Sequence, residues 1–118
     1  MKPVAWIASS LKDLRAFPEE LRDDVGFSLY QAQLGRKPAD AKPLRGFGSA
    51  NVLEIVASGD DRTYRAVFTV QFADIIYVLH CFEKKSRSGI ATPRQEIDLI
   101  KARLKLAEQE YKTWKESK

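Results

Sequence analysis

The side chains of this sequence that could do chemistry are basic rather than paired acids or histidines. Arg65 lies at the start of one predicted strand, and His80, Lys84 and Lys85 lie along or just beyond another. An arginine fork binds two phosphate oxygens without losing its proton, and a lysine beside other positive charges can act as a base. Such groups suit RNA cleavage without metal, in which the 2′-hydroxyl attacks the adjacent phosphate and the crowded phosphorane needs stabilising.

A second set of residues could hold an RNA strand near these groups. Basic side chains neutralise phosphates, and aromatic rings stack on unpaired bases. The candidate RNA-binding residues are Lys42, Arg45, Tyr64, Phe82 and Arg87. Plainer interpretations stay open: Tyr64, His80 and Phe82 could be core residues, and Arg65 could pair with Glu54 or Asp74.

Composition limits the other possibilities. The 118 residues predict a single domain, 1–118, and the net charge of +4 suggests an anionic partner. Cys81 and His80 are the only residues of their types, which argues against a disulfide, a thiolate cluster or a paired-histidine zinc site. We therefore expect no metal and no cofactor. No apolar run is long enough to span a membrane, so we expect a cytoplasmic protein without a membrane partner.

Apolar spacing and turn residues predict the elements that must position these groups. Ser10 offers the N-cap of a first helix, Pro18 should open a second, and Thr92-Pro93 has the form of a capping box that opens a long amphipathic helix. Gly26 interrupts the second helix at a cost of about 1 kcal/mol relative to alanine. Residues 36–50 read as a loop. The predicted strands are 3–7, 52–57, 63–72 and 75–83.

This order predicts an α+β fold, with a small antiparallel sheet packed against helices and a C-terminal amphipathic helix. One face of the sheet should be covered by helices and the other left concave and available. The two-residue period puts Arg65 on the more polar face of its strand, with Tyr64 on the core face. In the last strand, the same period puts His80, Phe82 and Lys84 on one face, opposite Tyr77, Leu79 and Cys81.

Several stretches of the sequence resemble a known family. They are Tyr64-Arg65-Ala66-Val67-Phe68, the run from Tyr77 to Ser86, Gly89-Ile90, Thr92-Pro93 and Arg103-Leu104. In these stretches the chain is similar to the HigB-like, phage-related branch of the RelE/ParE toxins. The resemblance covers nearly the whole chain, and it matches Arg65, Lys84 and Lys85 to the basic strand residues of the family.

The resemblance implies a RelE-like fold and metal-independent cleavage of messenger RNA, usually on the translating ribosome. It also implies a partner antitoxin with a helix-turn-helix domain, through which the pair would bind operator DNA. Two alternatives remain open at this point. One is a ParE-like toxin that poisons DNA gyrase without nuclease activity, and the other is a non-toxic interaction module.

Overall fold

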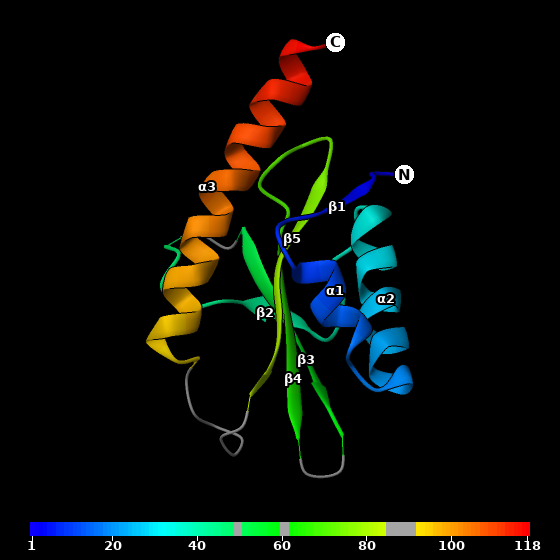
Figure 1. The fold of residues 1–118 in the computed structure, drawn as a ribbon. Helices are drawn as coiled ribbons and strands as arrows, with labels where there is room; N and C mark the ends of the chain where they lie inside the picture. Colours follow the sequence, from blue (N-terminus) through cyan, green and yellow to red (C-terminus); the bar gives the residue numbers. More distant parts are fainter. Residues whose placement is uncertain (49–50, 60–61, 85–91) are drawn as a thin grey trace.

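The computed structural model describes residues 1–48, 51–59, 62–84 and 92–118, and in them it shows a sheet with helices on both faces (Figure 1). The elements in chain order are β1 (Val4–Trp6), α1 (Ser10–Arg15), α2 (Glu19–Gln33), β2 (Ala41–Pro43), β3 (Val52–Ser58), β4 (Thr63–Thr69), β5 (Ile76–Lys84) and α3 (Arg94–Glu116). The predicted α+β class and the C-terminal helix are confirmed. No helix in these ranges is long and apolar enough to cross a membrane.

The strand order is β1-β5-β4-β3-β2. The central strands β3, β4 and β5 are antiparallel, as predicted, but β1 runs parallel to β5, with Val4 opposite Ile76. The sheet is therefore mixed. A parallel neighbour needs a long connection, and the chain between β1 and β5 supplies one. The prediction of a loop over 36–50 was also wrong in part, because Ala41 to Pro43 form the edge strand β2.

One face of the sheet packs against α1 and α2. The apolar positions of α2, including Leu21, Val25 and Leu29, meet the alternate residues Ala66 and Phe68 of β4 in one buried cluster. Val25 and Phe68 have no exposed surface at all. This face is the main core, and it fixes the strands that carry the polar groups of the other face.

The prediction that the other face is left open was wrong, because α3 packs across part of it (Figure 1). Ile100 and Ala107 of α3 are fully buried there, with Val67 and Leu79 of the sheet. The apolar side of the amphipathic helix α3 thus forms part of the core. Polar side chains occupy the rest of this face. We call the whole face the α3 face.

A bulge in β5 changes which side chains share the α3 face. Val67 pairs with His80 but its neighbour Phe68 pairs with Val78, so Leu79 is an extra residue in β5. Tyr77 and Leu79 consequently pack in the same cluster as Phe82 on the α3 side, while Cys81 belongs to the α1 and α2 side. The predicted placement of Tyr77 and Leu79 opposite Phe82 was wrong, because a bulge inverts the alternation beyond it.

The helix starts also differ from the expected caps. Ser9 rather than Ser10 is the N-cap of α1, and its hydroxyl donates to Asp13 Oδ2 at 2.8 Å. Pro93 occupies the N-cap of α3, where no side-chain cap bond forms. The predicted capping box at Thr92 is therefore absent, because the box requires the threonine itself at the N-cap.

Candidate active site on the α3 face

Four strands bring charged side chains together on the α3 face, in a group that we call the basic cluster: Lys42, Glu54, Arg65 and Lys84. Lys42 lies directly opposite Glu54 in the β2–β3 pairing. Thr63 pairs with Lys84 and Arg65 pairs with Phe82, so Arg65 and Lys84 are diagonal neighbours on one face. The period-two pattern put Arg65 on the polar face of its strand and Lys84 on one face with His80 and Phe82, and strand pairing shows that these are the same face of the sheet.

Most of the basic cluster is buried. Arg65 is 7% exposed, Glu54 4% and Lys84 3%, whereas the Lys42 side chain is 63% exposed. Arg65 Nη1 donates to Glu54 Oε2 at 2.7 Å, and Lys42 Nζ lies 3.8 Å from Glu54 Oε1. The plain interpretation of Arg65 as the partner of Glu54 is thus confirmed. Its other possible partner, Asp74, instead accepts from Tyr111 at 2.6 Å.

The basic cluster has more positive charge than its one carboxylate can balance. Arg65 Nε and Lys84 Nζ are both buried and have no hydrogen-bond partner among the described residues. Burial lowers the pKa of Lys84, and the adjacent charge of Arg65 lowers it further. Buried polar atoms are normally satisfied, and exceptions indicate a place for a ligand or a water. A negatively charged hydrogen-bond acceptor, such as a phosphate, would satisfy both groups.

A second polar group lies on the same face and contains Ser9, His80, Glu96 and Arg103; we call it the histidine cluster. His80 Nε2 contacts the Glu96 carboxylate, and Nδ1 lies 3.2 Å from Arg103 Nη1. Arg103 also donates to the Leu79 carbonyl at 2.9 Å and to Ser9 Oγ at 3.2 Å. Arg103 of α3 is therefore anchored to β5 and to the residue that caps α1.

The contacts of His80 determine which ring nitrogen has the proton. A guanidinium can only donate, so Nδ1 must accept from Arg103, and Nε2 keeps its hydrogen and donates to Glu96. Burial is the main cause that lowers the pKa of His80, against the opposing effect of the bond to Glu96. Both nitrogens of the neutral imidazole are therefore engaged, and the ring is held in place between Glu96 and Arg103.

Phe82 lies between the two clusters. Its ring stacks on that of His80, with centroids 4.7 Å apart and planes 18° apart, and its backbone pairs with Arg65. Phe82 is only partly buried. It is thus the aromatic ring of the candidate set that lies beside the basic cluster.

The comparisons with known proteins agree with this fold. Residues 12–105 match the family described as "Phage derived protein Gp49-like (DUF891)". The chain belongs to this family. It is a family of the RelE/HigB toxin type, so the resemblance inferred from the sequence is confirmed. No curated protein gave a significant match.

Two solved structures are similar to this Gp49-like chain. One is an arginine-to-alanine double mutant of the E. coli toxin RelE in the free state, with 20% identity, a TM-score of 0.52, and 68% of this chain and 80% of that chain covered. The other is the toxin–antitoxin complex RelBE2 from Mycobacterium tuberculosis, with 18% identity, a TM-score of 0.44, and 72% and 93% covered. The likeness to RelE shows a shared fold.

The remaining candidate residues of the Gp49-like chain are not gathered at the basic cluster. Tyr64 is 8% exposed on the opposite face of the sheet, where its ring packs 4.8 Å from that of Phe17. Arg45 is exposed in the turn that follows β2. Lys85 and Arg87 lie outside the described residues. Of the proposed site, the structure therefore unites Arg65, Lys84 and Lys42, with Phe82 beside them.

Sequence reasoning did not assign Glu96 or Arg103 to a site, and Arg103 entered only as part of the family resemblance. Arg103 is 9% exposed although it is an arginine in a solvent-facing amphipathic helix, and it lies one residue before Leu104 of the apolar stripe. A charge at the border of an apolar stripe was the available signal. The partner could not be inferred, because His80 is 23 residues away in the chain.

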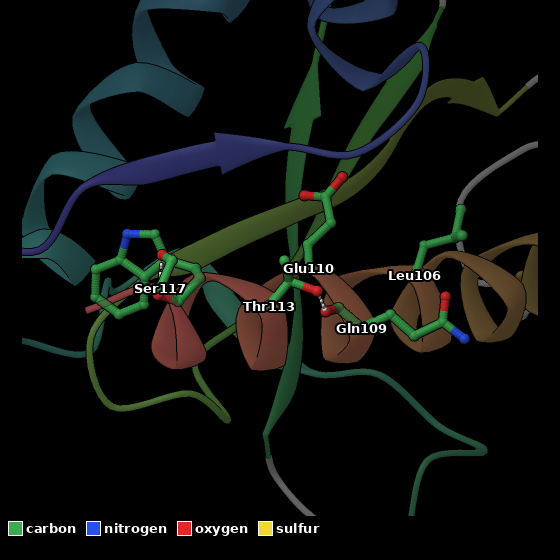
Figure 2. Close-up of a pocket in the computed structure, with 6 residues that line it drawn as sticks. Leu106, Gln109, Glu110, Thr113 and Ser117 are labelled. Carbon is green, nitrogen blue, oxygen red and sulfur yellow. Dashed lines mark hydrogen bonds between the residues drawn. The ribbon is translucent and has the colours of Figure 1, made fainter.

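A hollow on the C-terminal half of α3 offers no comparable chemistry (Figure 2). Its two hydroxyls are bonded to the helix backbone, since Thr113 Oγ1 donates to the Gln109 carbonyl and Ser117 Oγ to the Trp114 carbonyl. Glu110 is the one ionisable group of its lining. In the described part of the chain, no group of three or more His, Cys, Asp or Glu side chains could hold a metal ion.

Proposed function

We propose that this Gp49-like protein is the toxin of a type II toxin–antitoxin system and a metal-independent endoribonuclease that cuts messenger RNA on translating ribosomes. The observation that carries the proposal is the basic cluster, in which Arg65 Nε and Lys84 Nζ are buried without partners among the described residues. Membership of a RelE/HigB-type family supports the toxin role. The partner we propose is a helix-turn-helix antitoxin, through which the pair would contact operator DNA.

In the proposed reaction, the scissile phosphate occupies the space beside Arg65 and Lys84. The 2′-oxygen attacks phosphorus as its proton leaves, the bond to the 5′-oxygen breaks, and that oxygen leaves with a proton. Arg65 stabilises the phosphorane, because its fork offers Nε in addition to the nitrogen held by Glu54. Lys84 adds positive charge, and its lowered pKa eases proton exchange with the reacting oxygens.

The other residues of the site bind or position in this proposal. Lys42 and Arg45 are exposed and would guide the RNA backbone, as would Lys85 and Arg87. Phe82 would stack on a base. We assign His80 to holding the Phe82 ring, because both of its own nitrogens are engaged.

The test is induced expression in a bacterial host, with growth followed and transcript 5′ ends mapped. The expected result is growth arrest with new cuts inside translated frames. Arrest with intact transcripts would contradict the nuclease and favour a bound target such as gyrase. No arrest at all would leave an interaction module and contradict the toxin role.

Replacement of Arg65 tests its assigned role. Arg65→Ala should abolish arrest, because loss of one preorganised donor to a developing oxyanion slows a reaction by roughly 10²- to 10³-fold. The substitution also leaves the buried Glu54 carboxylate without its main partner. The neutral double variant Glu54→Gln/Arg65→Gln avoids this and serves as a second test that keeps the fold. Arg62→Ala is the matched control, since the Arg62 side chain is 67% exposed. Full toxicity of folded Arg65 variants would sink the assignment.

A further inference from the structure

The outer surface of α2 carries apolar side chains that the described chain leaves uncovered. Phe27 is 62% exposed, Tyr30 45% and Leu34 41%. Spacings of three and four residues place them on one face of the helix, and we call them the α2 stripe. They make up half of the six large hydrophobic residues that are exposed in the described ranges. Aromatic residues grouped in this way typically mark an interaction surface.

Gly26 adds a second observation at the same place. It lies inside α2, is exposed, and a Cβ added to it would meet nothing within 4 Å. Glycine weakens a helix interior relative to alanine, and no neighbour within the described chain requires it. Since Gly26 lies next to Phe27 and one turn before Tyr30, it would let the backbone of another helix approach the stripe closely.

The charges around the stripe have opposite signs at its two ends. Glu20, Asp23 and Asp24 are exposed and precede Phe27 by seven, four and three residues, so they lie on its side of the helix. Arg36 and Lys37 are exposed just beyond the other end of α2. A copy of α2 laid antiparallel on this surface would put each acidic end against a basic end. A parallel copy would put like charges together.

We propose that the α2 stripe is the contact surface of a homodimer, in which α2 helices of two copies cross antiparallel about a two-fold axis. A two-fold contact is self-complementary, so Phe27 of each copy packs against Tyr30 of the other with Gly26 at the crossing. Leu21, Val25 and Leu29 of α2 pack against the sheet, so the exposed stripe lies on the other side of the helix. The helices α2 and α3 cover opposite faces of the sheet (Figure 1), and the basic cluster lies on the α3 face. Dimerisation therefore leaves the basic cluster uncovered, and the inference is independent of the proposed nuclease activity.

Three side chains per copy form a small interface, so we expect a dissociation constant on the order of 10 µM. Sedimentation velocity of the purified full chain, from about 1 µM to about 500 µM, would bracket that constant. Phe27→Glu should weaken association at least tenfold, by placing a charge in the contact. Leu106→Glu is the matched control, because Leu106 is 47% exposed on α3. A monomer throughout this range, or equal weakening by Leu106→Glu, would overturn the proposal.

Charge reversal tests the antiparallel direction. Asp23→Lys/Asp24→Lys should weaken association, as should Arg36→Glu/Lys37→Glu, and combining all four should restore it. No restoration would overturn the antiparallel arrangement. Gly26→Ala should raise the melting temperature of the dilute monomer while weakening the dimer severalfold. A dimer that is unchanged or tighter in this variant would overturn the crossing at Gly26.

Discussion

The two polar clusters of the α3 face hold buried charge in opposite ways. In the histidine cluster, both ring nitrogens of His80 are engaged, and Arg103 is shared among three acceptors. In the basic cluster, three cations surround one carboxylate, and two buried nitrogen atoms lack partners among the described residues. The clusters share β5, which carries both His80 and Lys84, and Phe82 lies between these two residues in that strand.

This difference distinguishes a polar network that holds elements together from a cluster that could bind a ligand. A satisfied network rigidifies the elements that it joins, and Arg103 joins α3 to β5 and to the residue that caps α1. A cluster with unsatisfied buried donors lowers the stability of the folded protein unless an anion is bound. Such clusters are expected mainly at ligand-binding sites. The comparison therefore favours Arg65 and Lys84 over His80 as the proposed ligand site.

Removing the carboxylate of the basic cluster should give the largest effect. Glu54→Gln leaves Arg65, Lys84 and Lys42 without a counter-charge, and loss of one partner of a buried pair costs about 3 kcal/mol. The free energy of unfolding, measured in urea, should fall by that order. The matched control is Glu83→Gln, whose pair with Arg62 is 3.3 Å long with side chains 28% and 67% exposed. An exposed pair of this kind contributes less than about 1 kcal/mol. Equal losses in the two variants would contradict the distinction between the clusters.

Removing the unpartnered lysine should have the opposite sign. Lys84→Met replaces a buried ammonium by an apolar chain of similar length and should stabilise the protein by about 1 kcal/mol. Inorganic phosphate at constant ionic strength should raise the melting temperature of the unmodified protein, because a ligand that binds only the folded state stabilises it. The Lys84→Met variant should lose this response.

The control for Lys84→Met is the exposed Lys112. Lys112→Met should change stability by no more than about 0.5 kcal/mol and keep the phosphate response. A destabilised Lys84→Met protein, or one that still responds to phosphate, would show that the ammonium is satisfied in the folded state.

The basic cluster was largely predictable from the sequence, whereas the histidine cluster was not. Strand period two placed Arg65 on the polar face of its strand and Lys84 on one face with His80 and Phe82, and the predicted strands 52–57 and 63–72 correspond to the antiparallel pair β3 and β4. Both inferences rest on local pattern. Burial of Lys84 depends instead on how strands pair, and pairing register has no local signal.

The bulge at Leu79 shows most clearly where local pattern fails. The sequence around Leu79 contains no glycine that would mark a bulge, yet one extra residue there moves Tyr77 and Leu79 to the α3 face. The parallel pairing of β1 with β5 could not be predicted for a related reason. A strand of three residues has too little pattern to indicate which strand it pairs with. The contacts of Arg103 could not be predicted either, because its partners lie outside α3.

The smallest expected effect is a pH dependence that belongs to the histidine cluster alone. Burial holds the pKa of folded His80 below its ordinary value of 6.5, so the unfolded chain takes up a proton first as the pH falls. The stability due to neutral His80 is thus complete above pH 6.5 and is lost as the pH falls from there towards the folded-state pKa. His80 is the only histidine, so His80→Gln should flatten urea-unfolding stability across this window. Lys84→Met retains His80 and its contacts, so this variant should keep the original slope. A slope that His80→Gln leaves unchanged would mean that the pKa of His80 is the same in the folded and unfolded chains, which would contradict the lowered pKa of the buried ring.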